Sequence, residues 1–364
     1  MPLSPLFQPV AFADLPGWFS DDQLAAFAAF RRSALHVLSK PYRTGSLGVA
    51  FTAFSAAYSD SRETPPSDVA GARAFFERHF FPALVCPAPL EAGLVTGFYE
   101  PIVAASPVRT ERFTVPILSR PDDLIDIDEA SRPSGMDPYL AFARRTESGP
   151  VEYFDRRQIE TGALAGRGLE VAWLEDKVDA FFIHVQGAAR LNMTDGSSKR
   201  ITYAAKSGQM FSGPGRLLAD LGEIPLEQVT MQSIRAWFKA NPRRVDEILQ
   251  QNRSYIFFRE APVDDPELGP VAAAKVPLTP GRSVAVDRLL HTFGTPFYID
   301  APGLKAFGGT PFRRLMIAQD TGSAIIGPAR GDLFAGSGDA AGEVAGVVRN
   351  AARFYALLPK DLLP

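Results

Sequence analysis

The C-terminal part of this sequence, from residue 254 onward, consists of short β-type runs separated by Gly and Pro turns. These runs lie at residues 255–258, 283–287, 296–299 and 315–318. Their spacing is irregular and long helices do not alternate with them, which argues against a doubly wound parallel sheet. Short strands joined by tight turns favour closure of the sheet on itself, so the pattern predicts a β-barrel.

Two amphipathic helices are expected near the N-terminus. Ser20-Asp21-Asp22 and Ser67-Asp68 each provide an N-cap ahead of apolar residues at helical spacing. The apolar residues of the first helix are Leu24, Phe27, Phe30, Leu35 and Leu38. Those of the second, which is expected to end near Pro82, are Val69, Ala72, Phe75, Phe76 and Phe80.

The middle of the chain predicts a second domain, and a length of 364 residues agrees with two. Residues 121–150 are rich in Asp, Pro, Ser and Gly around a helix-like segment at 139–145, which is typical of a domain's periphery. A turn is expected at 194–197, and helices on either side of Pro242 at 230–238 and 245–249. Strands are predicted at 94–99, 115–118, 170–173, 180–187 and 199–203.

The charge balance constrains the ligand. A formal net charge of −3 gives no general basic field for a nucleic acid or an anionic membrane surface, so a neutral or mixed-charge substrate fits better. Apolar runs are broken well before the roughly 18 residues of a transmembrane helix. The N-terminus lacks the pattern of an export signal. Either the protein stays in the cytoplasm, or this is a mature or trimmed form.

Several common chemistries lack their sequence patterns. The histidines His36, His79, His184 and His291 are far apart without zinc-ligand spacing, so no metal is predicted. A G-x-S-x-G nucleophile motif is absent, and the single cysteine, Cys86, is expected to be a packing residue.

The glycines of residues 336–342 come near a dinucleotide-binding fingerprint. Their spacing is off by one, and no βαβ unit follows because the sequence ends soon afterwards. We interpret the segment as a closely packed turn and helix, and no cofactor is predicted.

A carboxylate at the end of an apolar strand is the strongest candidate for catalysis. Asp320 follows the apolar residues 315–318 and stands immediately before Thr321-Gly322. In a turn of this kind a side chain can point into a cleft while the backbone turns away. The alternative is an Asx-turn, in which Asp320 only caps its own backbone. The local pattern alone leaves both open.

An Asp-Thr-Gly of this kind also occurs in aspartic peptidases. Their chemistry needs two carboxylates that share a proton, and a chain of this length would carry two copies of the motif. This sequence has one copy, and subunits of retroviral type, which carry one each, are far shorter. An aspartic peptidase therefore remains a remote alternative.

Four blocks, in order, give this sequence a wider resemblance. The blocks are Thr96-Gly97-Phe98-Tyr99-Glu100-Pro101; residues 153–160 with Gly162 and Leu164; residues 179–187 running on to 202–208; and residues 283–346. With these blocks the sequence resembles the membrane-bound lytic murein transglycosylase A family, whose C-terminal domain carries three aspartates.

The resemblance implies a double-psi β-barrel with an inserted smaller β-domain, peripheral helices and a substrate groove. The barrel would comprise residues 1–105 and 252–364, with the three-aspartate segment at about 283–346. The insert would comprise residues 106–251. This division agrees with the change of pattern along the chain.

The resemblance also implies an enzyme, a peptidoglycan lytic transglycosylase. Such an enzyme cleaves the β-1,4 bond between N-acetylmuramic acid and N-acetylglucosamine without water and leaves a 1,6-anhydromuramic end. One carboxyl group can act as acid and then as base, whereas an ordinary glycosidase needs two. Asp320 would be that group, in a dry site provided by Met316, Ile317, Ile325 and Ile326.

Other residues of the matched blocks are candidates for support and for sugar binding. Asp287, Asp332 and Gly322 would brace the site, although turn or barrel structure explains them equally well. Strand packing or surface roles remain open for each of the candidate sugar contacts. These contacts are Thr96, Gly97, Tyr99, Gln186, Tyr203 and Lys206.

Three departures from the family pattern affect the sugar subsites: Gly187-Ala188-Ala189, Tyr203-Ala204-Ala205-Lys206-Ser207-Gly208, and Ser323 after the acidic turn. They motivate the alternative of a catalytically altered peptidoglycan-binding protein. The expected partner is the peptidoglycan glycan strand, with cell-wall synthesis complexes as further partners to test. A monomer in the periplasm, associated with the outer membrane, is expected, although the given sequence shows no export signal.

Overall fold

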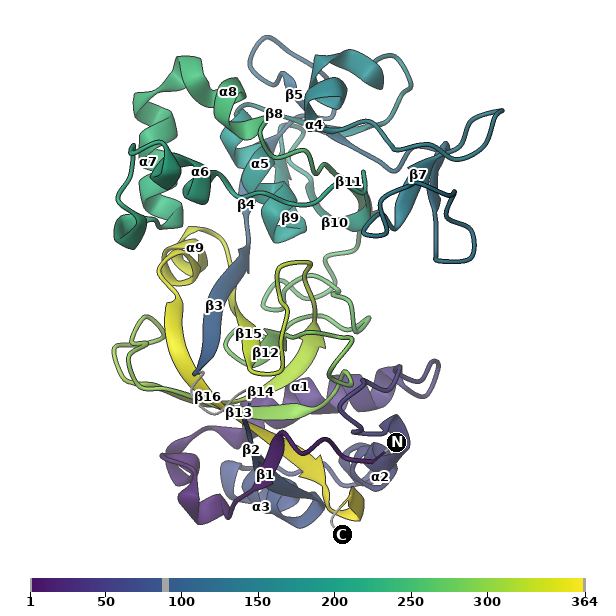
Figure 1. Cartoon of the computed structure of the whole chain (residues 1–364). Coiled ribbons are helices and arrows are strands. Elements are labelled where there is room, and N and C mark those ends of the chain that lie inside the picture. The colour runs from purple at the N-terminus through teal and green to yellow at the C-terminus, as the bar shows by residue number, and fades with distance from the viewer. Residues whose placement is uncertain (1, 87–91, 363–364) are drawn as a thin grey trace. The chain divides into compact units, whose positions relative to one another are not determined.

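The computed structural model describes residues 2–86 and 92–362. The chain divides into two compact units, which are considered separately (Figure 1). The first unit comprises residues 1–99 and 265–364, and the second comprises residues 100–264. From the sequence, the boundaries are expected at 105 and 252. The structure moves them outward because two strands outside the predicted insert, β4 (Ile102–Ala105) and β11 (Ile256–Ala261), pair within the second unit.

An eight-stranded sheet forms the first unit, in the order β1-β2-β16-β13-β14-β12-β15-β3. An additional pairing between β16 and β3 closes six of these strands into a ring, from β16 through β13, β14, β12 and β15 to β3. The predicted mixed, mainly β class is confirmed. The strands are β1 (Phe7–Pro9), β2 (Phe80–Val85), β3 (Gly93–Glu100), β12 (Ser283–Ala285), β13 (Pro296–Ala301), β14 (Phe312–Asp320), β15 (Arg330–Ser337) and β16 (Arg349–Pro359).

Helices α1 (Gln23–His36) and α3 (Val69–His79) pack with this sheet, α2 (Ser55–Glu63) packs against α1, and α9 (Asp339–Gly346) joins β15 to β16. The predicted N-caps are confirmed, since Asp22 accepts from the Ala25 amide and Asp68 from the Gly71 amide. Phenylalanines from α1 and α3 fill a shared aromatic core. The expectation that Leu35 and Leu38 join the packed face is wrong, because both are exposed and Leu38 lies beyond the end of α1.

The second unit contains the four-stranded sheet β11-β10-β9-β4 and the pairs β5–β8 and β6–β7. Single bridges from Ser106 to Trp173 and from Ser119 to Phe258 link the β5–β8 pair to both edges of the larger sheet. Apolar residues from these strands and from α5 form a core of their own. The remaining strands are β5 (Val115–Leu118), β6 (Leu124–Asp126), β7 (Phe142–Arg144), β8 (Glu170–Leu174), β9 (Ala188–Met193) and β10 (Ser198–Lys206).

Two predictions in this unit are wrong. Residues 180–187 are predicted as a strand, but residues 180–186 belong to helix α5 (Lys177–Gln186), which Asp176 caps through two backbone amides, and Gly187 is its C-cap. A short apolar run buried on most sides does not show by periodicity whether it is helix or strand. Residues 139–145, predicted as helical, contain strand β7, because pairing with β6 overrides their helix propensity. The other helices are α4 (Arg156–Gln158), α6 (Pro214–Asp220), α7 (Met231–Ala240) and α8 (Val245–Leu249).

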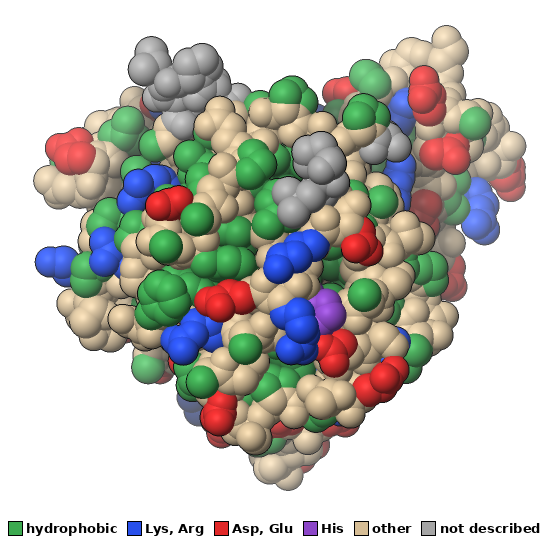
Figure 2. Space-filling view, turned by 90° about the horizontal axis from the view of Figure 1, so that it is seen from below, with side chains coloured by type: hydrophobic (Ala, Val, Ile, Leu, Met, Phe, Trp, Pro, Cys, Tyr) green, Lys and Arg blue, Asp and Glu red, His purple; other side chains and the backbone are tan. Residues whose placement is uncertain are grey.

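The described part of the chain has no helix both long and apolar enough to span a bilayer. On the face of the molecule shown in Figure 2, acidic and basic side chains are interspersed. This mixture agrees with the formal net charge of −3.

A glycine secures the strand that carries the candidate acid. The Gly294 amide donates to the Ala318 carbonyl of β14 at 2.8 Å, and Gly294 has a φ of +87°. A Cβ atom at this position would lie 2.0 Å from the buried Tyr58 hydroxyl oxygen. Both the backbone conformation and the space require glycine here.

We predict that Gly294→Ala lowers the free energy of unfolding by roughly 2–5 kcal/mol, because left-handed strain and overpacking add. Gly309→Ala is the matched control. Gly309 has a φ of +80° with open space around its Cα, so only the strain, about 1–2 kcal/mol, applies. Chemical denaturation measures both losses, and equal losses would show that the Tyr58 contact imposes no packing constraint.

Candidate active site

Strand β14 places Asp320 at its C-terminal end. The strand lies between β13 and β12, and residues 315–319 within it are fully buried. Such a continuously buried run is typical of a strand covered on both faces. Gln319, the polar residue in this run, is satisfied by Ser283, Ala29 and Ser33. Asp320 is therefore the first carboxylate that the buried strand presents at its end.

The surroundings of Asp320 favour its protonated form. The pKa of the carboxyl group is raised to about 6, mainly by loss of hydration and to a smaller extent by the nearby Asp332, against three opposing contacts. The backbone amides of Thr321 and Ala273 and the charge of Lys275 lower the pKa. The Ala273 amide donates to Asp320 Oδ1 at 3.2 Å. A group with this pKa exchanges its proton near neutral pH.

The apolar residues predicted around Asp320 are mostly buried. Met316 and Ile317 are fully buried, and Ile325 is nearly so. Ile326 was expected to contribute to the dry site, but its side chain is 74% exposed, so that prediction is wrong. The turn in which the Ile325 amide donates to the Gly322 carbonyl at 3.0 Å sends consecutive side chains in different directions. Gly322 itself lies in this exposed turn.

Asp332 lies in the same row of the sheet as Asp320. Ala285 of β12 pairs with Asp320 on one side and with Asp332 on the other. The two aspartates are therefore separated by two strand spacings, about 10 Å between Cα atoms. Burial raises the pKa of Asp332, while a hydrogen bond from Thr96 and the charge of Arg330 oppose the rise. At this spacing the two carboxyl groups influence each other without sharing a proton.

Thr96 connects Asp332 to a cation. Its hydroxyl group donates to Asp332 Oδ1 and accepts from Arg330 Nη2 at 2.8 Å. Arg330 is not among the site residues predicted from the sequence. Its position two residues before Asp332 on the same strand was the available signal, because side chains at i and i+2 of a strand share a face.

Asp287 holds the loops beside the site. Its carboxylate accepts from the backbone amides of Leu289 and Gly327, both at 3.0 Å. The neighbouring Val286 amide donates to the Asp320 carbonyl at 2.9 Å. Asp287 thus joins the loop after β12 to the loop after Asp320, and its geometry is that of a brace.

Gly97 and Tyr99 lie against α9. A Cβ atom on Gly97 would be 2.9 Å from the Ala345 backbone, so glycine lets β3 and the helix approach. The Tyr99 ring is buried, and a Cβ atom on Gly342 would lie 2.9 Å from it. The interpretation of residues 336–342 as a closely packed turn and helix is confirmed by this contact.

Gln186, Tyr203 and Lys206 belong to the second unit. The Tyr203 amide donates to the carbonyl of Gly187, the residue after Gln186, at 2.8 Å. Tyr203 is exposed, and Lys206 places its ammonium 4.8 Å from the centre of the Tyr139 ring. The candidate sugar contacts are thus divided between the units: these three in the second, and Thr96, Gly97 and Tyr99 in the first.

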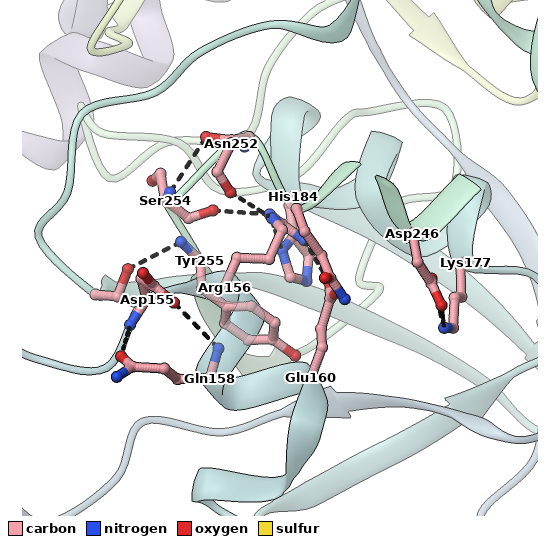
Figure 3. Close-up of polar contacts among 12 residues, drawn as sticks. Asp155, Arg156, Gln158, Glu160, Lys177, His184, Asp246, Asn252, Ser254 and Tyr255 are labelled. Carbon is pink, nitrogen blue, oxygen red and sulfur yellow. Dashed lines mark hydrogen bonds and ion pairs between the residues drawn. The ribbon is translucent and has the colours of Figure 1, made fainter. Parts of the chain in front are cut away.

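A buried arginine, Arg156, connects several segments of the second unit. Arg156 donates to the backbone carbonyls of Asn252 and Ser254 and to Glu160 Oε1, at 2.8–3.1 Å (Figure 3). It also contacts His184 Nδ1 at 3.1 Å. Burial and this cation hold the pKa of His184 well below its usual value, so the ring is neutral. Arg156, within the matched block 153–160 but not singled out from sequence, fixes the helix that ends at Gln186.

The other histidines have separate roles. His36 stacks on Tyr42, His79 pairs with Asp60, and His291 contacts the Pro328 carbonyl. Among residues 2–86 and 92–362, His, Cys, Asp and Glu side chains do not gather in a group that could hold a metal ion. Cys86 is a free, half-buried thiol.

The first unit is therefore a mainly β domain in which two carboxyl groups flank one strand. Comparison with models of known protein families shows which class of domain it is. A family model described as the 3D domain matches residues 282–358, which contain Asp287, Asp320 and Asp332. A second, described as the MltA specific insert domain, matches residues 94–259.

Curated proteins and solved structures are also similar to this chain. The crystal structure of membrane-bound lytic murein transglycosylase from Agrobacterium tumefaciens is 50% identical, with 98% of each chain covered and a TM-score of 0.92. The curated membrane-bound lytic murein transglycosylase A of Escherichia coli K12 is 32% identical over 72% of this chain and 64% of its own length. The corresponding protein of Vibrio cholerae is 34% identical over 56% of this chain and 55% of its own length.

This chain belongs to the membrane-bound lytic murein transglycosylase A family. The match spans less than two thirds of the length of both curated relatives.

We predict that Asp320→Asn raises the free energy of unfolding at neutral pH. A folded pKa of about 6 exceeds the ordinary value, so the carboxyl group stabilises the fold when protonated, and this contribution is lost as the pH rises through about 6. The neutral amide avoids a desolvated charge, a gain of roughly 1–2 kcal/mol after allowance for partial exposure.

Urea denaturation at pH 7.5 and at pH 3.5 measures this gain, which should vanish at the lower pH. Asp264→Asn, at an exposed position, is the control and should show no such pattern. An equal effect of Asp320→Asn at both values would contradict the desolvation account.

Proposed function

We propose that this protein is a peptidoglycan lytic transglycosylase in which Asp320 acts first as acid and then as base. The observation that carries the proposal is the half-buried carboxyl group at the end of β14, whose pKa is raised to about 6 by desolvation. Family membership supplies the substrate class, the glycan strand of peptidoglycan. A mixed surface charge suits a polymer whose sugar backbone is largely neutral.

The reaction needs one group that both gives and takes a proton. Protonated Asp320 donates to the oxygen that links muramic acid C1 to N-acetylglucosamine, and the C1–O bond breaks. The Asp320 carboxylate then accepts the proton of the muramic C6 hydroxyl, whose oxygen bonds to C1. Asp320 ends protonated as it began, and water takes no part. The intramolecular nucleophile replaces the second carboxylate of an ordinary glycosidase.

Asp332 acts on this cycle through its charge. Its separation from Asp320 suits an electrostatic influence, because a nearby negative charge favours retention of the Asp320 proton. Thr96 and Arg330 hold Asp332 in place and stabilise its ionised form. In this proposal Asp332 and Asp287 are positioning residues, and Gly322 is part of the turn that leads the chain away from the acid.

The finer fold assignment is part of the same proposal. The ring of six strands, with β12 parallel to β14, supports a double-psi β-barrel as the catalytic domain. The second unit would be the inserted domain that contributes Gln186, Tyr203 and Lys206 to sugar binding. The family name supports a membrane-associated location in the periplasm.

The aspartic peptidase alternative has no support in this site. Two carboxyl groups that share a proton must be in contact, whereas Asp320 and Asp332 lie on either side of Ala285. The alternative of a peptidoglycan-binding protein without activity gives no reason for a desolvated carboxyl group at the end of a strand.

We predict that Asp320→Asn reduces the release of anhydro-muropeptides from purified sacculi by about 10²–10⁴-fold, the usual contribution of acid–base catalysis. Mass spectrometry should show wild-type products lighter by one water than reducing-end products. Asp264→Asn should retain activity, and sacculus pull-down should show that Asp320→Asn still binds. Reducing-end products would indicate a hydrolase, and binding without turnover by the wild type would indicate a binding protein.

We also predict that kcat/KM falls as the pH rises through about 6, because Asp320 must carry its proton when substrate binds. Soluble glycan fragments measured between pH 4 and pH 8 give the profile. Activity that stays level up to pH 8 would exclude Asp320 as the acid.

A further inference from the structure

A short hairpin from Val271 to Pro277 lies beside Asp320. Val271 and Pro277 form an antiparallel bridge, and the Ala272 amide donates to the Val276 carbonyl at 3.1 Å. The Lys275 amide donates to the Ala272 carbonyl at 2.9 Å and closes the turn. This is a three-residue hairpin loop whose last residue takes the left-handed conformation.

Lys275 occupies that left-handed position, with a φ of +62°. It is the one non-glycine residue with a positive φ in residues 2–86 and 92–362. Glycine is the usual residue here, because a Cβ atom crowds the following carbonyl oxygen in this conformation. Strained backbone of this kind concentrates at functional sites, which directs attention to the lysine side chain.

The hairpin is fixed directly against the candidate acid. The Ala273 amide donates to Asp320 Oδ1 at 3.2 Å, and the Ala274 amide donates to the Gln319 carbonyl at 3.0 Å. The Tyr42 hydroxyl secures the other side by donating to the Ala274 carbonyl at 2.9 Å. Lys275 follows these contacts immediately, and its side chain is exposed.

Two charged side chains influence the Asp320 carboxyl group. Asp332 and Lys275 act on Asp320 with opposite signs, together with the Thr321 and Ala273 amides. Lys275 is close enough to His36 of α1 to act on its charge, as is Lys40 from the segment that follows α1. Burial and the two lysines lower the pKa of His36, so this ring is neutral at neutral pH. Lys275 is thus the cation that opposes Asp332 at the acid.

We propose that Lys275 is a positioning residue that stabilises the ionised form of Asp320, so that the group can release its proton during the reaction. Burial and Asp332 both favour the protonated acid, and a carboxyl group held too firmly in that form is a poor proton donor. The lysine charge and the Ala273 amide counterbalance them. The strained conformation persists because it delivers a cation to this place.

Three substitutions separate charge from backbone effects. Lys275→Gly removes the charge and relieves the strain, Lys275→Asn removes the charge with a residue that tolerates the conformation, and Lys275→Arg keeps the charge. Each is compared with the wild type in two measurements. These are the pH dependence of kcat/KM and the carbon-13 NMR titration of the Asp320 carboxyl, assigned with Asp320→Asn.

In Lys275→Gly and Lys275→Asn, the pH at which kcat/KM falls on the alkaline side should rise by about half a pH unit, and so should the midpoint of the Asp320 carboxyl titration. Lys275→Arg should keep both at the wild-type position. The shift should shrink at 1 M salt, because the lysine is exposed and salt screens its charge. A purely structural role would leave the titration unchanged, since Lys275→Gly favours the hairpin.

The inference rests on the proposed function for its catalytic meaning, and the two measurements separate the failures. If wild-type protein forms anhydro products but neither charge-removing variant shifts the titration, the inference is wrong and the proposed function stands. If the titration shifts but the wild type releases no anhydro products, the proposed function fails and the electrostatic role of Lys275 remains. Loss of activity in Lys275→Arg without any titration shift would assign Lys275 to substrate contact and overturn the inference.

Discussion

The loss of water around the Asp320 carboxyl is the constraint on which the site depends. Strand β14 is paired along both edges and buried over residues 315–319, so the side chain that follows it emerges from the driest part of the sheet. An aspartate in such a place keeps its proton at a pH where an exposed one is ionised. The ring of strands, the glycine at 294 and the brace formed by Asp287 all serve to hold that strand end.

The surrounding groups then adjust the affinity of Asp320 for its proton in opposite directions. Asp332, across one strand, favours retention, whereas the Ala273 amide and Lys275 favour release. Asp332 is in turn held by Thr96 and Arg330. A single carboxyl group that must act as acid and then as base needs such a balance, because an extreme in either direction would slow one of the two proton transfers.

Sequence predicts the parts of this account that are local. The apolar run before Asp320 and the N-caps of α1 and α3 can be predicted from the sequence because neighbouring residues determine them. The helix α5 was mistaken for a strand because its apolar run is buried from several sides, and Ile326 was placed in the dry site although the turn after Asp320 exposes it. The hairpin with Lys275 could not be predicted, since its contact with Asp320 arises from the packing of distant segments and a positive φ at lysine has no sequence signal.

Carbon-13 NMR titration of the Asp320 carboxyl in the wild-type protein tests the central claim most directly. The account predicts a midpoint at about 6, set by desolvation. A midpoint near 4, the ordinary value for an exposed aspartate, would contradict it, because the group would then be ionised at neutral pH and unable to serve as the acid.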